Sequence, residues 1–168
     1  GTYSATSETT DITSEDGGTL SFDSDAGSTM THNSGTFEFS YEGSSFIRPD
    51  GGDNFYDVLV SGGTGAKTIR STSTIANDYI ITGKAGGYTN KALTVTGDMI
   101  VNGTYDQAWS GFTATLTLST LNVSGTFISN NDTFTDITKL NILLNKFKIV
   151  IILWKIKESQ YGKLGQIN

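Results

Sequence analysis

The chain has 168 residues, a net charge of −6 and a sequence pI of about 4.6, and it contains no Cys. Its length suits one domain with a substantial core. The lack of Cys excludes disulfides, thiolate nucleophiles and Cys-ligated metal centres, and the acidic balance argues against nucleic-acid binding.

The composition predicts strands and tight turns. The chain holds 26 Thr, 18 Ser, 20 Gly and a single Pro, while hydrophobic residues make up 36% and aromatic residues 11%. Such a Thr-rich and Gly-rich chain favours strands over helices, and its apolar content is too high for a disordered profile. Because the sequence starts at Gly1, we expect a fragment or a processed form.

The N-terminal stretch "GTYSATSETTDITSEDGG" (1–18) is polar and almost without core residues. We expect residues 1–16 to form a leader. A weak first coil is the alternative.

A phrase of alternating apolar residues followed by Gly recurs along the middle of the chain. Its glycines are 19 to 22 residues apart, and each has apolar residues two and four positions before it. The glycines are Gly43, Gly62, Gly83, Gly103 and Gly125, and the residues two before them are Tyr41, Val60, Ile81, Val101 and Val123. Apolar residues two apart indicate strands with one inward side. A Gly after each strand indicates a turn with positive φ or a close backbone approach.

This repeat predicts an all-β fold, a parallel β-solenoid (β-helix) with coils of about 20 residues over 17–138. Inward residues of successive coils should form columns, because coils stack about 4.8 Å apart. An antiparallel β-sandwich is the alternative, since it also uses short strands and Gly turns.

An acidic loop follows the first strands. "RPDGGDNFYD" brings together Asp50, Asp53 and Asp57, which are candidates for a weak Ca²⁺ site or, in the enzyme alternative, for acid catalysis. A solvated loop is the default, and we expect no catalytic residue and no cofactor. The single His32 cannot build a multi-His metal site.

The most individual stretch is "GTYDQAWSGF" (103–112). Tyr105, Asp106 and Trp109 are candidates for stacking on a sugar ring beside a carboxylate. We favour the other interpretation, an aromatic corner that fills the interior of the solenoid, because large aromatic side chains are usually buried.

Threonines alternate in "TATLTLST" (113–120), a pattern that on flat solenoids can bind ice. Thr94 and Thr96 lie near the matching place, but the coil "NDYIITG" holds no such pair. We therefore expect ordinary solvent-facing threonines without register between coils.

The composition changes at residue 139. Residues 139–168 hold six Lys and one Glu, a net charge of +5, whereas the preceding residues carry −11. The run "IVIILW" (149–154) is far shorter than the roughly 18 residues that a membrane-spanning helix needs. The segment is predicted to cap the solenoid; the alternatives are a partner-binding or membrane-surface element, or a non-native extension.

Three segments together resemble a known class of protein. "THNSGTFEF" (31–39), "NFYDVLVSG" (54–62) and "KTIRSTSTIANDYIITG" (67–83) resemble adhesin-like parallel β-helix repeats of bacterial and phage surface proteins. The resemblance covers roughly residues 17–128. It implies an extracellular, cell-surface or virion scaffold without a catalytic residue.

The expected function is therefore that of a structural or adhesive surface module. Its expected partners are cell-surface glycans, fibre-forming neighbours or further copies of the chain, without nucleic acid and without a membrane span. The alternative is a carbohydrate-binding or polysaccharide-cleaving β-helix domain.

Overall fold

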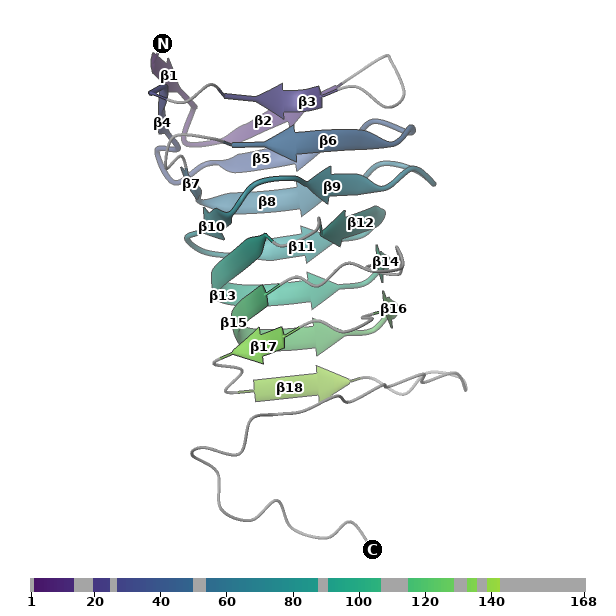
Figure 1. Ribbon diagram of the computed structural model, residues 1–168. Helices are drawn as coiled ribbons and strands as arrows, with labels where there is room; N and C mark the ends of the chain where they lie inside the picture. The colour runs from purple at the N-terminus through teal and green to yellow at the C-terminus, as the bar shows by residue number, and fades with distance from the viewer. Residues whose placement is uncertain are drawn as a thin grey trace, which may run out of the picture.

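The computed structural model describes residues 2–13, 20–24, 27–49, 54–87, 91–106, 115–128, 133–135 and 139–142. Within these ranges the chain forms eighteen strands and no helix, and every strand pair is parallel. The strands stack along one axis as a β-solenoid with about 22 residues per turn (Figure 1). The predicted parallel β-solenoid is confirmed, and the alternative antiparallel sandwich is wrong.

Each coil runs along three faces of the rod, which we call the first, second and third face in chain order. The first face holds β7 (Asn54–Phe55), β10 (Ser73–Ile75) and β17 (Thr133–Thr135). The second holds β2 (Thr9–Ile12), β5 (Thr36–Phe39), β8 (Asp57–Val60), β11 (Tyr79–Ile81) and β18 (Lys139–Ile142). The third holds β3 (Leu20–Asp23), β6 (Ser45–Arg48), β9 (Lys67–Ile69), β12 (Lys84–Gly87), β14 (Thr104–Asp106) and β16 (Thr126–Ile128).

Two long strands, β13 (Ala92–Val101) and β15 (Thr115–Val123), belong to both the first and the second face. The N-terminal half of β13 pairs with β10, and its C-terminal half pairs with β11. The pairing of β13 with β15 shifts register between Val95 and Asp98, which marks the corner between the two faces. At the N-terminal end of the rod, β1 (Thr2–Ser4) pairs with β4 (Thr29–Thr31) in a separate small sheet.

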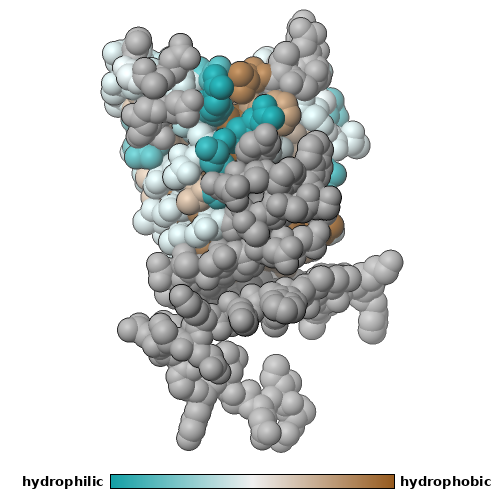
Figure 2. Space-filling model, in the orientation of Figure 1, coloured by the Kyte–Doolittle hydropathy of each residue, from teal (hydrophilic) through white to brown (hydrophobic). Residues whose placement is uncertain are grey.

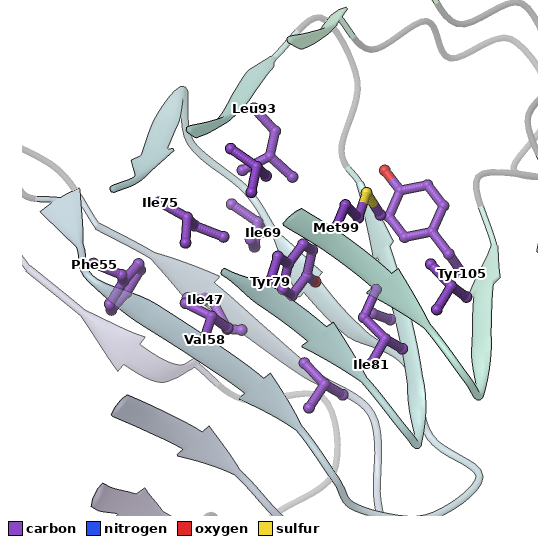
Figure 3. Packing of buried hydrophobic residues seen from close by; sticks show 14 of the residues in the cluster. Ile47, Phe55, Val58, Ile69, Ile75, Tyr79, Ile81, Leu93, Met99 and Tyr105 are labelled. Carbon is purple, nitrogen blue, oxygen red and sulfur yellow. The ribbon is translucent and has the colours of Figure 1, made fainter. Parts of the chain in front are cut away.

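The predicted column of inward residues is present on the second face. Ile81 pairs with Val60 on one side and with Val101 on the other, and Val101 pairs with Val123. Val60, Ile81 and Val101 have no exposed surface. Figure 3 shows how inward side chains of neighbouring coils fill the interior.

The predicted position of Tyr41 in this column is wrong. Phe39, not Tyr41, pairs with Val60, so the first copy of the repeat is shifted by two residues. The cause is that Phe37, Phe39 and Tyr41 continue the same alternation past the end of β5. A period of two does not tell which of them is the last inward residue of the strand. Gly43 lies instead at the start of the third face, because Ser45 pairs with Lys67.

The sheet extends beyond the range 17–138 that was expected for the solenoid. β2 lies within the expected leader and pairs in parallel with β5. β18 lies after residue 138 and pairs with β15. β2 lies at the edge of the sheet and pairs only with β5. Its side chains are therefore little buried, which suits its polar sequence: they alternate between exposed and half-buried.

Glycines stack at the corner between the second and third faces. A Cβ on Gly83 would collide with the carbonyl oxygen of Gly62, one on Gly103 with that of Gly83, and one on Gly125 with that of Gly103. None of these glycines has a positive φ, which Gly27 alone shows among the glycines of the described residues. Close backbone approach therefore explains why the repeat ends in Gly.

Tyr79 brings a hydroxyl group into the core of the rod. Its side chain is fully buried, and its Oη has no hydrogen-bond partner among the described residues. Burial raises the pKa of this phenol above its ordinary value of 10.0. An unpaired buried hydroxyl costs about 1–3 kcal/mol.

We expect Tyr79→Phe to stabilise the protein by about 1 kcal/mol in urea unfolding at neutral pH. The raised folded-state pKa makes the advantage grow above pH 10, because there the unfolded tyrosine ionises while the folded one stays neutral. Equal stability of the two proteins from pH 7 to 11 would contradict this assignment.

Candidate functional site

Of the three acidic residues in the predicted cation site, the structure describes only Asp57. Asp50 and Asp53 lie outside the described residues. Asp57 begins β8, and its Oδ1 accepts hydrogen bonds from the backbone N–H of Asp78 (2.9 Å) and from Nδ2 of Asn77 (2.8 Å). Asp57 therefore binds the corner of the next coil.

The same contact recurs one coil further on. Oδ1 of Asp78 accepts a hydrogen bond from the backbone N–H of Asp98 (2.8 Å), and Gly97 provides the space, since a Cβ there would contact this oxygen. Oδ2 of Asp98 in turn accepts from Nδ2 of Asn122 (3.3 Å). The three carboxylates form a ladder that joins successive coils. In the described residues no three His, Asp or Glu side chains gather as they would to hold a metal ion.

Two of the three candidate sugar-binding residues, Tyr105 and Asp106, lie on opposite sides of β14. Tyr105 has no exposed surface, and its ring stacks on Phe127 inside the rod with centroids 5.0 Å apart. Asp106 points outward and forms an ion pair with Lys84 at 3.4 Å. Trp109 lies outside the described residues. Tyr105 lies on the inward side of the strand, because β14 directs alternate side chains inward.

Lys67 is a buried cation that the sequence analysis did not predict. It stands on the inward side of β9, where Nζ donates to the carbonyl oxygens of Gly43 (2.8 Å) and Gly65 (3.1 Å) and lies 5.8 Å from the ring centroid of Tyr41. Burial lowers the pKa of Lys67, and the negative charge of Glu42 offsets part of this effect. The side chain thus joins the corners of two coils.

The third face carries charged and aromatic groups on its outer side. Arg48 Nε and Nη2 donate to the two carboxylate oxygens of Asp23 at 2.7 and 2.6 Å. The guanidinium of Arg70, one coil further, lies 3.6 Å above the ring centroid of Phe46. Figure 2 shows hydrophilic and hydrophobic residues side by side over the upper coils on the viewer's side. These pairs hold neighbouring coils together.

The first face bears threonines in register from coil to coil, contrary to the prediction from the sequence. Thr74 of β10 pairs with Thr94 of β13, Thr94 with Thr117 of β15, and Thr117 with Thr135 of β17. These four positions form one row along the rod axis. The described side chains in this row are neither buried nor fully exposed.

A second row runs beside the first, two residues earlier in each strand. Ala92 pairs with Thr115, and Thr115 pairs with Thr133. Thr72 occupies the same place one coil earlier, where its Oγ1 accepts a weak hydrogen bond (3.4 Å) from the backbone N–H of Ala92. Except for Ala92, both rows consist of Thr over these coils.

The expectation of threonines without register is therefore wrong for this face. The prediction rested on a comparison of Thr94 with the segment "NDYIITG", which lies on the second face. The proper counterpart is "STST" (71–74), at the start of the same coil. The partners of Thr94 depend on where each coil turns from one face to the next.

Comparison with known proteins found no matching family model, no matching curated protein and no matching solved structure. No helix in the described parts of the chain is long and apolar enough to span a membrane.

Proposed function

We propose that the chain is a non-catalytic structural or adhesive module of an extracellular, cell or virion surface. The observation that supports this proposal most directly is the continuity of the stacked coils. Inward columns run through the rod, and side-chain ladders join neighbouring coils on its outside. A core of this kind gives a stiff spacer whose loops face outward.

Two coil-to-coil bonds illustrate the stiffness. Ser40 Oγ donates to Asp11 Oδ1 at 2.6 Å, and Ser124 Oγ donates to Asn102 Oδ1, also at 2.6 Å. They lie near opposite ends of the rod, and both cross from one coil to the next. The edge of a parallel sheet can pair with a further strand, so fibre-forming neighbours or another copy of the chain are the proposed partners.

Limited proteolysis combined with a polysaccharide screen tests the proposal. We expect residues 36–123 to survive as one resistant body, with the cuts confined to its ends and loops. We also expect no turnover of acidic or neutral polysaccharides. Rapid cleavage within the strands would refute the stiff spacer. Turnover that is lost in Asp57→Asn would replace the proposal with the polysaccharide-cleaving alternative, and that variant keeps an oxygen acceptor for the backbone N–H of Asp78.

A further inference from the structure

The two threonine rows of the first face share a regular spacing in two directions. Neighbouring coils lie about 4.8 Å apart, and residues two apart in one strand lie roughly 6.7 Å apart. The pairs from Ser73 to Ile75, from Leu93 to Val95 and from Leu116 to Leu118 are continuous, without a bulge. The register shift comes only after Val95, at the corner. The rows therefore lie on a regular part of the sheet.

Threonine is well suited to hold such a spacing. Its branched Cβ leaves few rotamers, so the hydroxyl and methyl groups keep fixed positions above the sheet. The outward positions of both rows, at 72, 74, 92, 94, 115 and 117, carry no charged residue. In Figure 2 the side of the rod that holds β10 and β13 in Figure 1 is mostly pale, which corresponds to intermediate hydropathy.

We propose that the first face binds ice. The two spacings of the array approach the repeats between water oxygens along two axes of the ice lattice. Hydroxyls that repeat in this way can take the places of lattice waters, and the methyl groups between them order water without competing charges. A neutral and regularly spaced array of stiff side chains matches an extended crystalline surface, because many weak contacts then form together with little loss of conformational entropy.

The other two faces lack these properties. On the second face, the outward row of Leu59, Ile80 and Ile100 is aliphatic and lies beside the carboxylate ladder. On the third face, Thr104 pairs with Thr126, but the charged residues Lys84 and Asp106 flank that pair. This difference supplies a matched control on the same molecule.

The test is thermal hysteresis of the whole chain, read together with the shape of ice crystals. We expect the unaltered protein to show hysteresis and faceted crystals. Thr94→Tyr, in the middle of the array, should lose most of the hysteresis, because an outward Tyr suits a strand but projects beyond the hydroxyl plane. Thr104→Tyr, the same change on the third face, should keep it. Circular dichroism and the melting temperature show whether each variant is folded.

No hysteresis in the folded, unaltered protein would overturn the proposal. So would an equal loss in the two variants with both still folded. Neither result bears on the proteolysis and polysaccharide experiment, so the proposal of a surface module and the proposal of an ice-binding face can fail separately.

Discussion

Replacing Gly103 with Ala is expected to destabilise the protein by about 3 kcal/mol, at the upper end of the cost of overpacking. The added Cβ would collide with the carbonyl oxygens of Gly83 and Thr82 in the preceding coil. Those oxygens are backbone atoms, and the carbonyl of Gly83 also accepts the N–H of Thr104 at 2.8 Å. The carbonyl of Gly83 cannot move aside without breaking this hydrogen bond between two coils. Urea unfolding gives the change in free energy.

Gly27→Ala is the matched control for this prediction. Gly27 has a φ of +88°, yet no atom lies within 4 Å of the place where its Cβ would be. The variant therefore tests the dihedral angle without the collision, and its cost should be about 1–2 kcal/mol. If Gly103→Ala costs no more than Gly27→Ala, backbone approach does not explain the glycine column.

The inward columns could be predicted because two simple signals coincide there. Val60, Ile81, Val101 and Val123 are apolar, stand in alternating strands and recur at nearly constant spacing. Each signal depends only on residue type and on a period of two, which the sequence displays directly. The failure at Tyr41 has the same origin, since the period alone cannot tell where an alternating strand ends.

The candidate sites could not be predicted in this way, because they depend on pairing between coils. Asp57 accepts the backbone N–H of Asp78 only because the corners of the two coils align. Thr94 has Thr74 and Thr117 as neighbours only because of the register on the first face. The coil length varies, so one shift of the corner changes every outward partner. Lys67 was missed for another reason: a cation on the inward side contradicts the composition of a core, and carbonyl oxygens at two corners stabilise it there.

A pair of adjacent isoleucines offers the most direct test of the register. Ile81 faces inward with no exposed surface, between Val60 and Val101. Ile80 faces outward and is only half-buried. Ile81→Ala should cost about 3–4 kcal/mol, since it removes buried methyl groups and leaves a cavity in a stacked column. Ile80→Ala should cost about 1 kcal/mol or less, because its site is open to solvent and can relax.

The two variants differ by one position in one strand, so strand propensity and composition change equally in both. Only the side of the sheet differs, and a register slip by one residue exchanges the two sides. Urea unfolding of both variants, with an unchanged slope against denaturant, measures the difference. Equal costs, or a larger cost for Ile80→Ala, would show that the column of Val60, Ile81 and Val101 does not form the interior.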